Sequence, residues 1–108
     1  MSVTPSEWST IEKQVAQAAF KKAYEREIEA IKQIVRQNAE AIAEMDDVWR
    51  LHDFLSARRH DIDGKYDDSE AGLVFVFARL VKEGWLQLPE LDGLAADKLA
   101  KIAALAKM

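Results

Sequence analysis

The spacing of apolar residues predicts helices over most of the chain. Between Phe20 and Trp49 apolar positions recur mostly at steps of three and four, which is the period of one helix face. This stripe consists of Phe20, Tyr24, Ile28, Ile31, Val35, Ile42, Met45 and Trp49. Neither glycine nor proline occurs between Pro5 and Gly64. The pattern therefore predicts one long helix from Pro5 to Asp63, started by a capping box at Thr4–Glu7.

A straight helix of that length would measure about 90 Å at 1.5 Å per residue. The rest of the 108-residue chain is too short to cover it, so the helix must pack on something else or bend. A break is possible at Met45–Asp47, where Asp46 could cap a second helix. The stripe suits either packing within the chain or a seam between two copies, and the shortage of covering residues favours the seam. We expect a homodimer through this stalk, with an interface formed by Ile31, Val35, Ile42, Met45 and Val48.

The stretch after Met45 has two different faces. At 100° per residue, one arc carries polar side chains and a single tryptophan, namely Trp49, His52, Asp53, Ser56 and His60, with Arg59 at its rim. The opposite arc is apolar and carries Val48, Leu51, Phe54, Leu55 and Ile62. A tryptophan on a polar face either packs beneath a neighbouring helix or binds a partner, and tryptophan and arginine often dominate binding energy.

The residues after Gly64 predict a small helical head. Gly64 ends the long helix, and Asp67 or Asp68 caps a second helix that tolerates Gly72 and stops at Gly84. Val74–Phe77 has strand propensity, but the length, the cap and the glycine stop favour a helix. A turn at Gly84–Pro89 and a closing helix at Ala95–Ala106 complete the chain. We expect an all-α fold, with a long helical stalk over residues 1–63 and a compact helical head over 64–108.

Composition excludes several classes of function. The formal net charge of −4 gives no attraction for nucleic acid. The absence of cysteine excludes disulfides and thiolate metal sites. No apolar run approaches the roughly 18 residues of a membrane span, and the N-terminus lacks a signal-peptide pattern. We expect a soluble intracellular protein without an integral membrane segment.

The polar residues give little support for catalysis or metal binding. His52 and His60 would lie about 12 Å apart along one helix, too far to share an ion bound at about 2 Å. The stretch Arg59–Glu70 nearly fits a calcium loop, but an arginine stands at the first ligand position, which favours a solvated acidic turn. Ser56 has histidines on its face but no oxyanion hole. We expect no catalytic residues, no metal and no cofactor.

The sequence around the polar face is similar to a known family. The run WRLHDFLSARRHDIDGKYDD, from Trp49 to Asp68, closely resembles the fluorescence recovery proteins of cyanobacteria in residue identity. Shorter matches occur at Phe20–Glu27, Phe75–Ala78 and Leu94–Lys98. Together these matches span most of the chain.

The resemblance implies a function that the residues alone do not. Fluorescence recovery proteins are non-enzymatic regulators that bind the photoactivated orange carotenoid protein, mainly at its C-terminal domain. They accelerate its red-to-orange reversion and promote its release from the phycobilisome, which ends non-photochemical quenching. A cytoplasmic protein, peripheral at the thylakoid near phycobilisomes, is implied.

Carried over by position, the resemblance implies partner contacts at Trp49, His52, Asp53 and Arg59, with further contacts in the head at Phe75 and Lys101. From the residues alone, Trp49 could as well be an ordinary packed ring as a partner contact, and Arg59 could as well be an ordinary surface charge. The apolar neighbours of Phe75 favour a core position. The main alternative is a helical dimeric adaptor of the same fold with a different protein partner. A metal hydrolase is the third and weakest hypothesis.

Overall fold

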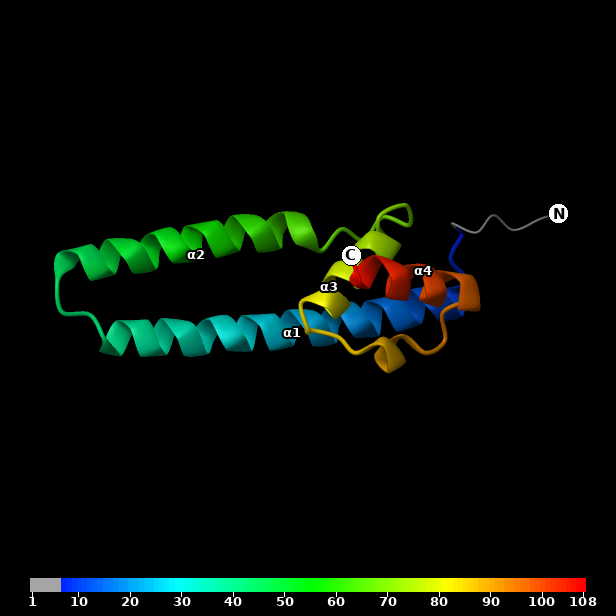
Figure 1. Cartoon of the computed structure of the whole chain (residues 1–108), viewed down its shortest axis with the longest axis horizontal. Coiled ribbons are helices and arrows are strands. Elements are labelled where there is room, and N and C mark those ends of the chain that lie inside the picture. The colour runs from blue at the N-terminus through cyan, green and yellow to red at the C-terminus, as the bar shows by residue number, and fades with distance from the viewer. Residues whose placement is uncertain (1–6) are drawn as a thin grey trace.

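The computed structural model describes residues 7–108 and is all-α (Figure 1). Its elements are α1 (Thr10–Glu40), α2 (Met45–Lys65), α3 (Leu73–Lys82), the 3-10 helix η1 (Leu88–Leu91) and α4 (Ala96–Ala106). The described part of the chain contains no β-sheet, only an isolated bridge between Asp92 and Leu94. The predicted fold class is therefore confirmed, including a helix at Val74–Phe77 in place of a strand.

The prediction of one unbroken helix from Pro5 to Asp63 is wrong, because the chain turns back after Glu40. α1 and α2 form an antiparallel hairpin whose turn lies at the end of the molecule opposite the head (Figure 1). The N-cap position of the second helix is Glu44 and not Asp46, and Asp47 in the first turn completes a capping box: its Oδ2 accepts hydrogen bonds from the backbone N–H groups of Ala43 and Glu44, both at 3.0 Å. These donors lower the pKa of the Asp47 carboxyl. The turn thus has a local cap.

The first helix starts later than its sequence predicts. Ser9 and Glu12 form a capping box, with the Glu12 N–H donating to Ser9 Oγ at 3.1 Å and the Ser9 N–H donating to Glu12 Oε1 at 3.0 Å. Of the start predicted at Thr4–Glu7, residues 4–6 lie outside the described residues, and Glu7 is not helical.

The hydrophobic core lies in the head, where α3, η1 and α4 gather against the N-terminal half of α1 (Figure 1). Small side chains let α1 approach closely, and Phe77 fills the space they leave. Its ring is fully buried, with centroids 5.0 Å from Phe20 and 6.3 Å from Trp8. The buried apolar residues are Trp8, Ala16, Ala19, Ala23, Leu73, Val76, Phe77, Ala78, Leu80, Leu86, Leu91, Leu94 and Ile102.

In the head, α3 begins later than predicted, whereas its end and the whole of α4 agree with the prediction. α3 begins at Leu73, not at Asp67 or Asp68, because Asp67 Oδ1 accepts the Ser69 N–H at 2.9 Å and holds a turn before Gly72. α3 ends before Gly84, whose φ of 86° suits glycine. η1 begins at the end of the stretch Gly84–Pro89 that was predicted as a turn and continues to Leu91. α4 matches the predicted closing helix.

The stalk has no core of its own within a single chain. The molecule measures 64 × 25 × 21 Å, and no residue from Ile28 to Gly64 is buried. A long helical stalk and a small head are therefore both present. The first half of α1 packs with the head, and the division into 1–63 and 64–108 stays a prediction.

Acid should weaken the head through Glu12. Burial alone would raise the pKa of the Glu12 carboxyl, but N–H donors from Ser9 and Ala95 and the ammonium of Lys98 together lower it from 4.5 to about 2. Since the folded pKa is the lower one, this carboxylate stabilises the fold fully above pH 4.5, and its contribution is lost as the pH falls toward about 2. We expect the melting temperature to drop across that interval, and Glu12→Gln to flatten part of the drop. Circular-dichroism melts would show this, and an identical pH profile in Glu12→Gln would contradict it.

Candidate protein-interaction sites

The polar face predicted on α2 is exposed as one surface. Trp49 is 53% exposed, and the rings of Trp49 and His52 meet edge to face with centroids 6.3 Å apart. His52 Nδ1 lies 3.3 Å from Asp53 Oδ1. These three side chains therefore form a contiguous patch near the turn. We call this patch, together with Arg59, the α2 face. No neighbouring helix within residues 7–108 covers it, so Trp49 does not pack beneath another helix in this part of the chain.

Arg59 lies further along the same helix and is free to bind. Its Nε stands 3.9 Å from Asp63 Oδ2, and both side chains are largely exposed. Ten residues separate it from Trp49, which corresponds to about 15 Å of helix. Its guanidinium presents a planar donor fork, which suits a carboxylate or a carbonyl. An exposed ion pair at this distance contributes little stability, so Arg59 has no evident structural role in the single chain.

Opposite Trp49 and Asp53, the apolar residues of α2 point toward α1, as the helical period predicts, and Arg59 stands at the edge between the two sides. Val48, Leu51, Phe54, Leu55 and Ile62 are all half-buried. Leu55 and Ile62 line a groove with residues of α1, among them Ile28 and Ile31. The two faces of α2 were therefore predicted correctly.

A second exposed site lies in the head. Phe75 is 56% exposed although its neighbours Val76 and Phe77 are buried, so the assignment to the core that composition favoured is wrong. The Nζ of Lys101, from α4, stands 5.6 Å from the centre of the Phe75 ring. Both residues line one hollow between α3 and α4 with Trp8 and Val74. The structure thus brings Phe75 and Lys101 together, away from the α2 face.

The residues predicted for a dimer interface follow the stalk. Ile31, Val35 and Val48 are half-buried along the hairpin, whereas Ile42 and Met45 lie at the turn, Met45 being 60% exposed. In the single chain, all five side chains are therefore at least partly exposed to solvent.

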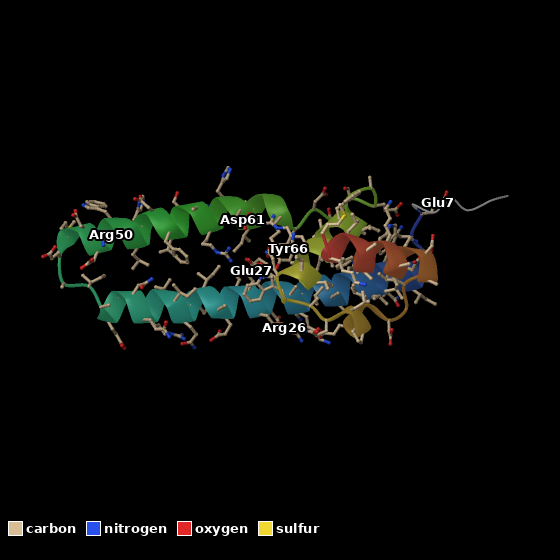
Figure 2. All side chains as sticks on the ribbon, in the orientation of Figure 1. Glu7, Arg26, Glu27, Arg50, Asp61 and Tyr66 are labelled. Carbon is tan, nitrogen blue, oxygen red and sulfur yellow. The ribbon has the colours of Figure 1, made fainter. Side chains whose placement is uncertain are left out.

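Sequence reasoning missed a buried polar cluster where α2 reaches the head. Glu27 of α1 is fully buried and accepts hydrogen bonds from three side chains: Arg58 Nη2 at 2.7 Å, Lys65 Nζ at 2.9 and 3.0 Å, and the Tyr66 hydroxyl at 2.8 Å. Figure 2 shows Glu27, Asp61 and Tyr66 at this junction. One signal was available, because Glu27 continues the four-residue spacing of Ala19 and Ala23, which are buried.

The carboxylates that suggested a calcium loop do not form one. Arg59 to Lys65 is helical, and Asp61 Oδ1 accepts a hydrogen bond from Arg79 Nη2 at 2.7 Å, which lowers the pKa of the Asp61 carboxyl. No group of three or more His, Asp or Glu side chains in residues 7–108 could hold a metal ion. Over the same residues, no helix is both long and apolar enough to cross a membrane.

Comparison with known proteins gives one consistent family. A model described as "photoprotection regulator fluorescence recovery protein" matches residues 8–106. The fluorescence recovery protein of Synechocystis sp. (strain ATCC 27184 / PCC 6803 / Kazusa) is 54% identical over 101 residues, which cover 94% of this chain and 93% of that protein.

Solved structures agree with the sequence comparison. The fluorescence recovery protein of Fremyella diplosiphon has a TM-score of 0.91 at 63% identity, and that of Synechocystis sp. PCC 6803 has a TM-score of 0.91 at 54% identity. Each match covers 94% of this chain and 100% of the solved chain.

Proposed function

Because the chain belongs to the fluorescence recovery protein family of photoprotection regulators, we propose that it binds the photoactivated orange carotenoid protein and accelerates its red-to-orange reversion. On this proposal it also promotes release of that protein from the phycobilisome and so ends non-photochemical quenching. It acts without catalytic residues or a cofactor. Its place is the cytoplasm, peripheral at the thylakoid.

The α2 face is the observation that supports this proposal most directly. A large exposed ring at Trp49 stands beside His52 and Asp53, with the donor fork of Arg59 further along one rigid helix. Aromatic and arginine side chains provide most hot spots in protein interfaces. A polar and aromatic set of this kind recognises a protein surface better than it performs chemistry on a small molecule. We place the C-terminal domain of the orange carotenoid protein on it.

The head supplies a second contact on this proposal. Phe75 and Lys101 combine an exposed apolar ring with a cation within 5.6 Å. A partner that touches both the α2 face and this head site is held at two separated points. Binding at two points distinguishes a closed arrangement of the partner from an open one, since only one arrangement fits both sites. A regulator that prefers the arrangement leading to the resting form lowers the barrier to reversion by differential affinity.

Colour reversion in darkness tests the proposed function. Photoactivated orange carotenoid protein is mixed with this protein, and the red-to-orange change is followed by absorbance against a sample without it. We expect reversion to speed up in proportion to the protein added, until the partner is saturated. Unchanged reversion at saturating concentration would contradict the function and leave the adaptor with a different partner.

We further propose that two copies associate as an antiparallel dimer through the stalk. The absence of any buried residue between Ile28 and Gly64 supports this, because half-buried apolar side chains on both helices remain for a second copy to cover. Ile31, Val35 and Val48 would lie along this interface, with Ile42 and Met45 at its ends. Light-scattering mass and small-angle scattering test it, and a compact monomer at micromolar concentration would end it.

Val48→Glu is expected to weaken that dimer. Val48 is half-buried on the apolar side of α2, and a carboxylate there would lose its hydration on association without gaining a partner. We expect the dissociation constant to rise while the helical spectrum stays unchanged. Light scattering over a concentration series measures this, with Arg50→Glu as the control on an exposed position of the same helix. Equal dimer mass in both variants would place Val48 outside the interface.

A further inference from the structure

α2 is attached to the rest of its own chain in an unusual way. None of its apolar residues is buried, and its one buried residue is Lys65. The side chain of Lys65 is fully buried, and its ammonium lies on the equally buried carboxylate of Glu27, at 2.9 Å. A hydrophobic core that would fix α2 against α1 is therefore missing along the stalk, and a polar contact takes its place.

Glu27 binds α2 from three directions. Arg58 approaches from one turn of the helix, Lys65 from its last turn and Tyr66 from the residue that follows. Burial and the neighbouring Glu27 carboxylate raise the pKa of the Tyr66 hydroxyl, so it remains a donor. Hydrogen bonds to a carboxylate are directional, so three donors on one buried carboxylate fix both the position and the rotation of a helix end. Apolar contacts are not directional and allow the helix to slide or rotate.

Contacts to α3 extend this attachment toward the head. Lys65 also reaches Glu83, and Asp61 pairs with Arg79, whose Nε donates to Glu83 at 2.8 Å. These outer pairs are partly exposed and so contribute less than the buried centre. At its other end, α2 is joined to α1 by the exposed turn around Asp47 and by half-buried apolar side chains such as Leu51. Within one chain, the Glu27 carboxylate is thus the main buried polar restraint on the direction in which α2 leaves the head.

We propose that Glu27 is a positioning residue for the α2 face: it touches no partner, and it sets the angle at which Trp49, Asp53 and Arg59 are presented relative to Phe75 and Lys101. The link is short, since Arg58, which binds Glu27, directly precedes Arg59 in the helix. Two sites that act on one partner must keep a fixed separation and orientation. The consequence for recognition rests on the function proposed above, whereas the effect on the direction of α2 does not.

Removing the charge of Glu27 should release this end of α2. Glu27→Gln keeps the shape of the side chain but leaves the buried Lys65 ammonium with only the partly exposed Glu83 carboxylate as a counter-charge, which draws the ammonium out of the junction. The connection at residues 66–72 is not helical, so it can follow the movement. We expect α2 to swing away from α1 about the turn at 41–44, while the head core stays folded.

The lack of cysteine makes this directly measurable, because spin labels can be attached at two introduced cysteines alone. Gln33→Cys on α1 and Ala57→Cys on α2 are both exposed and lie outside the proposed contacts. Electron–electron double resonance then measures the distance between the helices, with excess unlabelled protein added to dilute signals between two copies. We expect one narrow distance in the otherwise unchanged protein, and a longer and broader distribution in Glu27→Gln.

Two further variants separate positioning from stability. Glu29→Gln removes an exposed carboxylate from the same helix, whose contacts to Lys32, Gln33 and Arg36 all lie on the surface, and should keep the narrow distance. Glu27→Gln with Lys65→Met also removes the buried Lys65 charge that has lost its buried partner, so the melting temperature should recover. Because the two remaining donors, Arg58 and Tyr66, still lack the carboxylate and find only a neutral amide oxygen at position 27, the distance should stay broad, and colour reversion should be about tenfold slower than with the unchanged protein, or slower still.

A narrow distance in Glu27→Gln would overturn the proposal. So would a double variant that regains the narrow distance and normal reversion together with its melting temperature, since Glu27 would then only neutralise Lys65. If the unchanged protein fails to accelerate reversion, the proposed function fails, and the label distances still decide the role of Glu27.

Discussion

Phe77→Ala is expected to lower the free energy of unfolding by about 3 to 5 kcal/mol. The Phe77 ring is fully buried between Phe20 and Trp8, and it is among the largest side chains in the core. Truncation to alanine loses the transfer energy of the ring and leaves a cavity that the short helices around it cannot close fully. Domains of this size have a total stability of about 5 to 15 kcal/mol. Urea unfolding followed by circular dichroism measures the loss.

Phe75→Ala is the matched control, because it removes the same side chain from the same helix. Phe75 is 56% exposed, so its loss should change stability by about 0.5 kcal/mol or less. If the head site acts as proposed, the same variant slows colour reversion although it folds normally. Equal destabilisation by the two substitutions would contradict the core that the structure shows.

Substitutions in the α2 face are expected to weaken partner binding and to leave the fold and its stability unchanged. Trp49→Ala, Asp53→Ala and Arg59→Ala should each weaken recognition by about 1 to 4 kcal/mol, which is the range of interface hot spots. The physical reason differs for each residue: a large apolar ring, a short carboxylate that fixes orientation, and a planar donor fork. All three side chains are exposed in the single chain, so melting temperature and helical content should remain. Reversion rates at several protein concentrations measure the loss.

Arg59 allows a finer comparison within the same set. Arg59→Lys keeps the charge but loses the fork, and Arg59→Glu reverses the charge, so the second should impair reversion more. Arg50→Ala is the control, because Arg50 is an exposed arginine of the same helix outside the α2 face. If Trp49→Ala instead lowers the melting temperature or breaks the dimer first, the ring has a structural role. Full activity in all three alanine variants would remove the α2 face from the mechanism.

The sequence by itself determined the features that depend on neighbouring residues. The three- and four-residue period predicted helices and separated the two faces of α2, because a helix places residues by angle alone. Trp49 and Asp53 are exposed and Leu51 and Leu55 lean inward, as that angle requires. Gly84 ends α3 with a positive φ, which a glycine adopts without strain. Residue identity from Trp49 to Asp68 was enough to indicate the family.

The tertiary structure decided what distant residues do to one another. Ala41, Ile42 and Ala43 include no helix breaker, so only the Asp47 cap and the return of α2 along α1 reveal the turn. Phe75 and Phe77 lie in the same apolar run, and the packing of α1 and α4 leaves the first outside and buries the second. Glu27 and Lys65 are 38 positions apart, and although the spacing of Glu27 with Ala19 and Ala23 indicates a buried position, nothing in the sequence identifies Lys65 as its partner. The two side chains become buried against each other only when α1 and α2 pack together, because burial of a charged group is unfavourable unless an oppositely charged group pairs with it.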